Sequence, residues 1–303
     1  MPLRGTAQLQ LYILNRIAKK EMTMNQIAII TDSTATLPAR LIERYQLIVV
    51  PCQVRIGESV YREGVDLTGE ELFHRMFTSN SMPATSLPSG EDYAAAFAEV
   101  QRRGITQVLG LFVGSGLSGT FNGARLAAQE YELEVELVDS GTTSLALGLL
   151  VLEAARLVEA GGTLAEIAES LRDETAHLEA YALLDTLEFV RRGGRIGRVG
   201  ELIANLLNIK PILRVAHNTA DVAARTRSHR KGLAWLKDTL ADAAPVRGLG
   251  LIYTSGEAQQ IAESLIDELR PFVAEGGDVL LEPAGAAIAV HTGPNGIGLM
   301  YMK

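Results

Sequence analysis

The sequence predicts an α/β fold, on three observations. Short apolar runs alternate with longer amphipathic or alanine-rich segments, which indicates strands alternating with helices. Polar residues gather where the apolar runs end, as they do at the carboxyl ends of parallel strands. The chain has 303 residues, which is long enough for two domains, and Gly161-Gly162 is the clearest break. We therefore expect an α/β domain over residues 27–162 and another over residues 163–303.

The elements of the first half follow from this alternation. Strands are predicted at Gln26–Ile30, Leu47–Val54, Val108–Val113 and Val135–Val138, and helices at Pro38–Tyr45, Asp66–Phe77, Glu91–Arg103, Asn122–Glu130 and Thr143–Ala160. Between them, residues 83–90 (PATSLPSG) form a predicted loop. Two prolines restrict this loop, so we expect the hydroxyls of Thr85 and Ser86 to be held in place before any ligand arrives. Ser89 is expected only to cap the following helix.

The second half continues the pattern. Strands are predicted at Tyr181–Leu184, Pro211–Val215, Leu249–Tyr253 and Ala286–Val290, with a helix starting at Leu164 and another at Ala258–Phe272. Two basic runs, residues 191–198 and 225–231, stand out in an acidic chain. Each is either a solvated face or a docking surface for a phosphorylated partner, and the sequence leaves both alternatives open. His291, taken alone, suits a structural residue.

Composition limits the classes of function. A net charge of −8 argues against nucleic acid as the main partner, and no apolar stretch reaches the length of a membrane span. Cys52 has no second cysteine to pair with, which favours a reducing cytoplasm. Aromatic residues make up 5%, so the interior is aliphatic and suits a slim, flexible ligand. Residues 1–26 are predicted to be a mobile extension, with membrane-surface contact as the alternative.

The glycine turn after the strand at Val108–Val113 is the strongest candidate for a ligand site. It reads GSGLSGT and precedes a predicted helix, so unpaired N–H groups and the helix dipole would favour an anion there. Hydroxyls at Ser115, Ser118 and Thr120 could add directional donors. The alternative is a turn in which glycine serves only the backbone, and this alternative does not explain the three hydroxyls.

The same turn also satisfies a dinucleotide-binding pattern. Gly114, Gly116 and Gly119 match G-x-G-x-x-G, and Asp139 follows at the end of the next strand. A dinucleotide-dependent enzyme is therefore the alternative function. We discount it because the motif does not follow the first strand of a nucleotide-binding unit and because it leaves the paired hydroxyls unexplained. Residues Glu70, Glu71 and His74 share helical spacing, but a solvated face explains them better than a metal site.

The ordered set of motifs resembles the DegV family of bacterial fatty-acid-binding proteins, which serve as the lipid-carrying subunit of fatty acid kinase. The motifs are TDSTATLP (31–38), TSLPS (85–89), GSGLSGTF (114–121), VDS (138–140), RGGRIG (192–197) and HTGPNG (291–296). The resemblance implies two α/β domains with one buried acyl chain between them. It also implies no cofactor and no catalysis by this chain alone.

The resemblance assigns roles to particular residues. Thr85 and Ser118 match the family's ligands to the fatty-acid carboxylate, with His291 beside them at the head group. Arg225 matches an arginine tied, like His291, to phosphoryl transfer. Departures from the usual pattern are Leu87, Gly114, Phe121 and Asn295, where the family commonly has glutamine, serine, tyrosine and glycine.

Further residues are expected to assist these. Ser115 and Ser86 would support the head group, and Arg192 and Arg195 would face the kinase. The implied function is a carrier that presents the carboxylate of a long-chain fatty acid to a separate kinase, which converts it to acyl phosphate.

Overall fold

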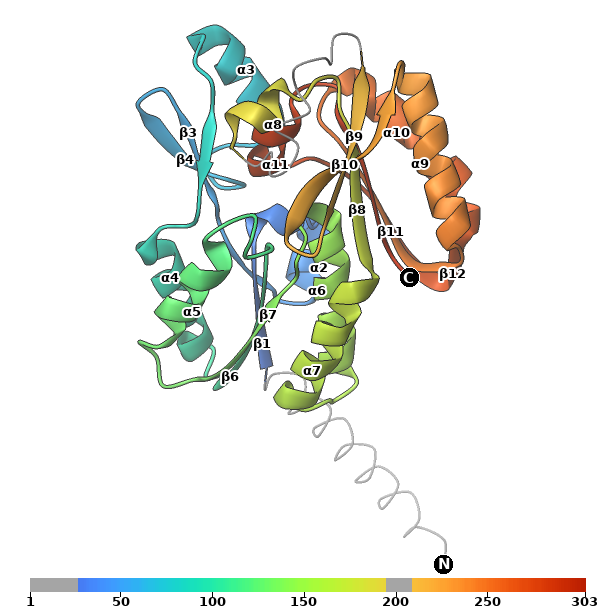
Figure 1. Ribbon diagram of the computed structural model, residues 1–303. Helices are drawn as coiled ribbons and strands as arrows, with labels where there is room; N and C mark the ends of the chain where they lie inside the picture. The colour runs from blue at the N-terminus through green and yellow to red at the C-terminus, as the bar shows by residue number, and fades with distance from the viewer. Residues whose placement is uncertain (1–26, 195–208) are drawn as a thin grey trace, which may run out of the picture.

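The computed structural model describes residues 27–194 and 209–303, and the strands within these residues form three sheets (Figure 1). The first sheet has the strand order β2-β1-β6-β7, the second has the order β10-β9-β8-β13-β11-β12, and the third has the order β4-β3-β5. The α/β fold class is confirmed. The predicted extension at residues 1–26 lies outside the described residues.

The first sheet is parallel throughout and is covered by helices on both faces. Its strands are β1 (Ile27–Asp32), β2 (Ile48–Val50), β6 (Gln107–Phe112) and β7 (Glu134–Asp139). Helices α4 (Gly90–Arg102) and α5 (Thr120–Ala128) pack on one face, and α6 (Ser144–Glu159) and α7 (Leu164–Glu174) pack on the other. Burial on both faces explains why the strands are continuous apolar runs. A short helix, α2 (Ala39–Arg44), links β1 to β2.

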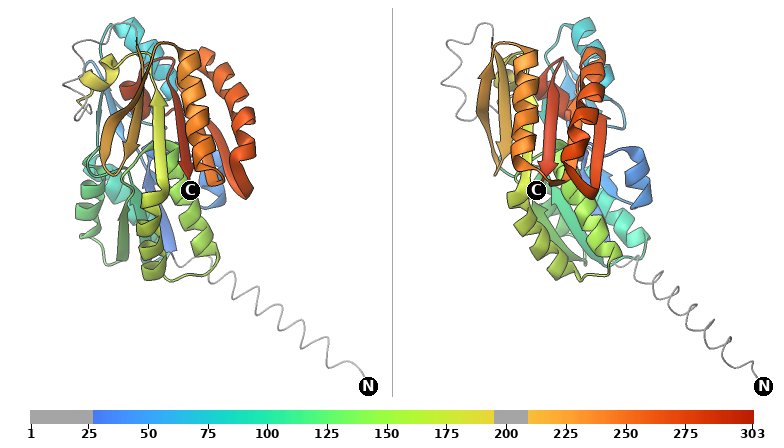
Figure 2. Two further views of the ribbon diagram at one scale, coloured as in Figure 1. Left: turned by 45° about the vertical axis from the view of Figure 1, so that its right-hand side comes forward. Right: turned by 90° about the vertical axis from the view of Figure 1, so that its right-hand side faces the viewer.

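The second sheet is mixed, with only β11 and β12 parallel to each other. Its strands are β8 (Leu178–Leu183), β9 (Lys210–Ala216), β10 (Thr219–Thr226), β11 (Val246–Tyr253), β12 (Val273–Pro283) and β13 (Ile297–Met302). Helices α9 (His229–Ala243) and α10 (Gly256–Leu269) cover its outer face (Figure 2). The inner face of this sheet packs against α6 and lines part of a cavity. The sequence prediction missed β10 and β12.

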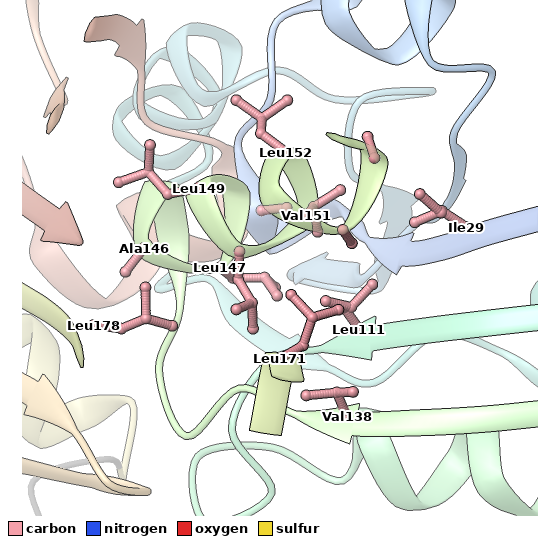
Figure 3. Packing of buried hydrophobic residues seen from close by; sticks show 14 of the residues in the cluster. Ile29, Leu111, Val138, Ala146, Leu147, Leu149, Val151, Leu152, Leu171 and Leu178 are labelled. Atoms are coloured by element: carbon pink, nitrogen blue, oxygen red, sulfur yellow. The ribbon is translucent and has the colours of Figure 1, made fainter. Parts of the chain in front are cut away.

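Helix α6 joins the two sheets. It contacts β1 and β6 of the first sheet and β8, β11 and β13 of the second. Side chains all around it are buried, as expected for a helix that is apolar on every face. Figure 3 shows Ile29 and Leu111 of the first sheet and Leu178 of the second around it. At Gly250 the approach is so close that an added Cβ would lie 2.7 Å from the Cβ of Leu145.

The predicted boundary at Gly161-Gly162 precedes α7, and α7 packs on β6 and β7 of the first sheet. The chain enters the second sheet only at β8, after a short 3-10 turn at Thr175–His177. The division of the chain into residues 27–162 and 163–303 stays a prediction.

The third sheet is small and joins the two halves of the chain. It contains β3 (Gln53–Ile56), β4 (Ser59–Arg62) and β5 (Ala84–Ser86), with α3 (Gly69–Ser79) beside it. Helix α11 (Ala286–Thr292) packs against α3, β3 and β5. The segment predicted as a loop at residues 83–90 therefore contains a strand, because β5 pairs with β3.

The predicted strand at Ala286–Val290 is wrong, because these residues form α11. A run of five apolar residues does not distinguish a strand from a buried helix by periodicity. Its three alanines favour helix, and Gly285 provides an extended N-cap. Helix α8 (Glu188–Arg192) completes the described helices, none of which is long and apolar enough to cross a bilayer.

Candidate functional site

A cavity lies between the carboxyl end of the first sheet and the inner face of the second. It contains about 990 Å³ of non-atom space, part of it open to solvent. The wall from the second sheet is aliphatic: Ala180, Ala182, Leu213, Val215, Ile252 and Met300. These side chains can contact an extended apolar ligand.

The opposite end of the cavity is polar. Its hydroxyl and imidazole groups come from loops and short elements around the first and third sheets: Thr34, Thr85, Ser86, Ser118, His291 and Thr292. The polar end lies at the carboxyl ends of β1 and β6, which are neighbours in the sheet. The connection that follows β1 and the connection that follows β6 pack on opposite faces of that sheet. Ligands of open α/β sheets bind at such switch points.

Thr85 and His291 meet at this polar end, although 206 residues separate them. Thr85 Oγ1 lies 2.9 Å from His291 Nε2. Thr85 is placed by β5, which pairs it with Val54, and His291 by the last turn of α11. When Nε2 carries a proton and donates it to Thr85 Oγ1, the threonine hydroxyl proton can point into the cavity as a donor. An added Cβ at Gly193 would lie 2.1 Å from His291 Nδ1, so only glycine lets the end of α8 pass this ring.

Ser118 approaches from the glycine turn. Its hydroxyl lies 2.8 Å from Thr120 Oγ1, and Thr120 N donates to Ser118 Oγ at 3.3 Å. Thr120 begins α5, so the positive end of that helix dipole faces this region. Tyr93 OH donates to the carbonyl of Thr120 at 2.8 Å and fixes the start of α5 from behind. The predicted binding of an anion at this turn stays a prediction.

Asp32 supplies the carboxylate that organises this end, and it was not among the residues predicted from the sequence. Its oxygens accept from Thr34 N at 2.9 Å, from Thr34 Oγ1 at 2.5 Å and from Val113 N at 2.8 Å. Burial raises the pKa of Asp32, and these hydrogen bonds oppose the rise. Asp32 holds the carboxyl ends of β1 and β6 together and orients Thr34 toward the cavity. Its position at a strand end within TDSTATLP was the available signal.

Glu63 was also missed, and it holds the helix that carries His291. Its carboxylate accepts from Ala287 N at 2.7 Å and from the Ser33 hydroxyl. The side chain is buried, and this burial raises the pKa of Glu63 to about 7. An added Cβ at Gly285 would lie 2.3 Å from the Glu63 carboxylate, so glycine there permits the contact. Nothing in the local sequence distinguishes Glu63 from a surface glutamate.

The described residues that line the cavity include no arginine, lysine, aspartate or glutamate. A carboxylate placed there would rely on hydroxyl donors, on His291 and on the dipole of α5. Burial also raises the pKa of Cys52, which lines the polar end, so its thiol stays neutral. Within the described part of the chain, no three His, Cys, Asp or Glu side chains group to hold a metal ion.

Of the other predicted site residues, Ser86 lines the cavity, whereas Ser115 and Arg192 do not. Ser115 is not among the described lining residues, because its hydroxyl donates to Asp139 at 2.5 Å. Ser86 lies at the exposed edge of the cavity, and its hydroxyl is 3.3 Å from the Gln53 side-chain oxygen. Arg192 pairs with Glu188 on α8, which reduces the positive charge of that run. Arg195 lies outside the described residues.

Arg225 is exposed near the end of β10 and is not among the described lining residues either. In the β9–β10 pairing Arg225 is opposite Pro211, the residue after Lys210. Lys210 belongs to a polar group around Asp185, which contacts Lys210 Nζ at 2.6 Å, His229 Nε2 at 2.5 Å and Asn295 Nδ2 at 3.1 Å. Burial alone would raise the pKa of Asp185, but these hydrogen bonds outweigh it and lower the pKa to about 2. The group therefore connects the basic end of the second sheet to the turn after His291.

The dinucleotide alternative is not supported. The Asp139 carboxylate, which that pattern would need for a ribose, instead accepts from Ser115 and Asn218. The glycines serve a protein contact: an added Cβ at Gly114 would lie 2.6 Å from Asn218 Oδ1, and one at Gly116 would lie 2.4 Å from the Asn218 carbonyl.

Comparison with known proteins agrees with the resemblance seen in the sequence. Residues 26–303 match the family model described as "Uncharacterised protein, DegV family". A DegV domain-containing protein of Streptomyces coelicolor is 34% identical over 274 residues, covering 90% of this chain and 97% of that protein.

Solved structures give the same result. A DegV family protein from Thermus thermophilus, described by its fatty acid binding, has a TM-score of 0.82 at 33% identity, with 92% of this chain and 99% of that chain covered. DegV of Bacillus subtilis, described as a fatty acid binding protein, has a TM-score of 0.80 at 28% identity, with the same coverage. A stearic acid-binding protein from Eubacterium ventriosum has a TM-score of 0.79 at 25% identity, with 91% and 98% covered.

Proposed function

This chain belongs to the DegV family, and we propose that it binds one long-chain fatty acid and presents the carboxylate to a separate kinase. The observation that carries this proposal is a single cavity with an aliphatic wall at one side and a cluster of hydroxyl and imidazole groups at the other. A fatty acid has the same division between an apolar tail and a polar head.

The aliphatic wall supplies most of the binding free energy. Burying a chain of about sixteen carbons contributes roughly 12 kcal/mol before the costs of association, at about 0.8 kcal/mol per methylene. A hydrogen bond to the charged head adds only about 1.5–3 kcal/mol. The tail therefore determines affinity, while the hydroxyls determine where the carboxylate lies.

The polar end would hold the carboxylate between Thr85, Ser118 and His291. Thr85 and His291 already contact each other, and Ser118 stands at the start of α5 among the same lining residues. We propose that the carboxylate accepts from the two hydroxyls and that His291 orients Thr85. The Ser86 hydroxyl marks the side of the head group that is open to solvent.

A kinase would reach the head group from that open side. One carboxylate oxygen attacks the terminal phosphorus of a nucleoside triphosphate held by the kinase, the bond to the bridging oxygen breaks, and a nucleoside diphosphate leaves. The product is an acyl phosphate. The chain has no G-x-x-x-x-G-K-[ST] motif, so we assign the nucleotide to the kinase. We propose that this transfer takes place in the cytoplasm, with transient membrane contact for lipid exchange.

The test is to denature the purified protein, extract it with organic solvent and identify the extract by mass spectrometry. We expect close to one fatty acid per chain. The matched control is the same protein refolded after extraction, which should yield none until stearic acid is added back. An empty extract, no uptake of stearic acid and thermal stabilisation by a nicotinamide or flavin nucleotide would overturn the proposal.

A further inference from the structure

The tip of the β9–β10 hairpin reaches from the second sheet to the carboxyl ends of β6 and β7 in the first (Figure 1). We infer that Asn218, at this tip, is a positioning residue that fastens the two walls of the cavity to each other around the ligand. This inference rests on the proposed fatty-acid binding and adds a residue that holds the site in shape.

Asn218 makes three hydrogen bonds across the two sheets. Its backbone N–H donates to the carbonyl of Gly141 at 2.8 Å, and its Oδ1 accepts from Gly116 N at 2.9 Å. Its Nδ2 donates to Asp139 Oδ2 at 3.1 Å. One side chain thus bonds to two different loops of the first sheet. Beside it, Thr142 Oγ1 donates to the Val215 carbonyl at 3.0 Å.

The first sheet is shaped to receive this side chain. Added Cβ atoms at Gly114 and Gly116 would lie within 2.6 Å of Asn218 atoms, so any other residue there would push the hairpin tip away. Asp139 also accepts from Ser115 N at 3.0 Å and from Gly141 N at 3.1 Å, which holds both loops around one carboxylate. The Ser115 hydroxyl, predicted as a ligand group, belongs to this receiving structure.

The hairpin needs such a fastening because of its place in the sheet. β10 is an edge strand, paired only with β9 among the described strands. The turn has φ of 50° at His217 and 65° at Asn218, a conformation that asparagine tolerates well. The pairing of β10 does not itself tie the tip to the first sheet, whereas the bonds of Asn218 do, together with the bond from Thr142 to Val215 in β9.

Both sides of the contact line the cavity. Val215 and Ala220 flank the hairpin turn on the second sheet, and Leu117 and Ser118 follow Gly116 in the turn on the first sheet. Asn218 therefore fixes the distance between part of the wall for the tail and the hydroxyl that faces the head. Losing it should speed ligand release and also weaken the preference for a carboxylate head.

The test uses Asn218→Asp, which places a second carboxylate beside Asp139, and the exchanged pair Asn218→Asp with Asp139→Asn, which restores one carboxylate and one amide. His217→Asn is the matched control, because it stays in the same turn and tolerates positive φ. Each protein is loaded with stearic acid, and release to excess phospholipid vesicles is timed at pH 8. Octadecanol, which lacks the carboxylate, is measured in parallel.

We expect release of stearic acid from Asn218→Asp to be about 10-fold faster or more, because like charges in contact destabilise each other. We expect the exchanged pair to return within about 3-fold of the wild type, since the amide and carboxylate can again pair. The ratio of stearic acid to octadecanol retention should fall in the single variant and recover in the pair. If Asn218 contributed only to the stability of the fold, its substitution would not change this ratio.

Release from Asn218→Asp at the wild-type rate, with the ratio unchanged, would overturn the inference. If that variant does not fold, hydrogen exchange of the backbone amides is measured in the wild type. The Gly116 and Asn218 amides should exchange more slowly when stearic acid is bound, and unchanged exchange rates would overturn the inference. Failure of the wild type to bind stearic acid would instead contradict the proposed function.

Discussion

The two large sheets contribute opposite chemistry to one cavity. The first sheet, parallel and covered on both faces, offers only its carboxyl-end loops, and these loops carry hydroxyls and backbone N–H groups. The second sheet, mixed in direction, offers the inner faces of its strands, and these faces carry aliphatic side chains. The face of a sheet therefore provides apolar surface for contact with a ligand, whereas the loops at strand ends provide polar groups that point in defined directions.

This contrast predicts that binding strength and head-group chemistry can be changed separately. Substitutions on the second sheet should alter how tightly, and for what length of chain, a fatty acid is held. Those on the first should alter what happens to the carboxylate. The following changes test this separation.

The largest effect is expected on the second sheet, for Ala182→Phe. The ring would occupy the space of about four methylenes, and at about 0.8 kcal/mol each this weakens binding of stearic acid by roughly 200-fold. Octanoic acid should be affected much less. Ala223→Phe, an exposed position on β10, is the control. Titration calorimetry measures both, and equal losses for the long and short acids would show that Ala182 does not face the tail.

A smaller effect on binding is expected at the polar end of the cavity, for Ser118→Ala in the turn after β6 of the first sheet or for Thr85→Ala in β5 of the third sheet. Removing one hydrogen bond to a charged group costs about 1.5 kcal/mol, or roughly 10-fold in affinity for stearic acid, with octadecanol unchanged. Formation of acyl phosphate with the kinase should fall further than lipid retention. Thr78→Ala, which removes an exposed hydroxyl on α3 away from the lining residues, is the control and should leave the acid-to-alcohol preference intact. Complete loss of lipid by a folded Ser118→Ala protein would contradict the separation.

Buried Glu63 and half-buried Asp185 differ in how they respond to pH. The pKa of Glu63 is raised to about 7 by burial, so the folded protein binds that proton more tightly than the unfolded chain. Its contribution to stability is present below about pH 4.5 and is lost as the pH rises through about 7. The contribution of Asp185 to stability depends on pH in the opposite direction. Because its pKa is lowered, that contribution is present at neutral pH and is lost only as the pH falls through about 2.

We therefore expect the wild-type free energy of unfolding to decrease between pH 5 and 8 by about 1–3 kcal/mol more than that of Glu63→Gln. Urea unfolding at several pH values measures this difference. Glu71→Gln, at an exposed capping position, should follow the wild-type slope over the same range. Parallel slopes for the wild type and Glu63→Gln would show that Glu63 does not titrate in that range.

The smallest effect is expected at the basic surface. Because Arg192 already pairs with Glu188, Arg192→Gln should weaken engagement of a kinase by only about 3-fold, in the range of an exposed ion pair. Arg195→Glu, a reversal of charge, should weaken it more. Retention of stearic acid should not change in either variant. Unchanged turnover with the kinase in both would remove these residues from the docking surface.

Much of the first half could be predicted from the sequence because its strands and helices have strong periodic patterns. The predicted strand at Val108–Val113 and the predicted helix at Glu91–Arg103 match β6 and α4 within one residue. The predicted strand at Ala286–Val290 was wrong because a short run of apolar residues shows no hydrophobic periodicity that would distinguish a strand from a helix. The hairpin strand β10 and the contacts of Asn218 were missed because they depend on pairing between distant segments.

The α/β class could be read from the sequence alone, and so could the glycine turn and the candidate residues Thr85, Ser118 and His291, all of which line the cavity. This was possible because strand period, helix caps and turn residues are local properties. Three contacts could be seen only in the tertiary structure. Thr85 contacts His291, the Ser115 hydroxyl donates to Asp139, and buried Glu63 accepts a hydrogen bond from the backbone of α11. Those outcomes depend on which distant segments pack together, and on the burial that sets the pKa of a carboxyl group once they do.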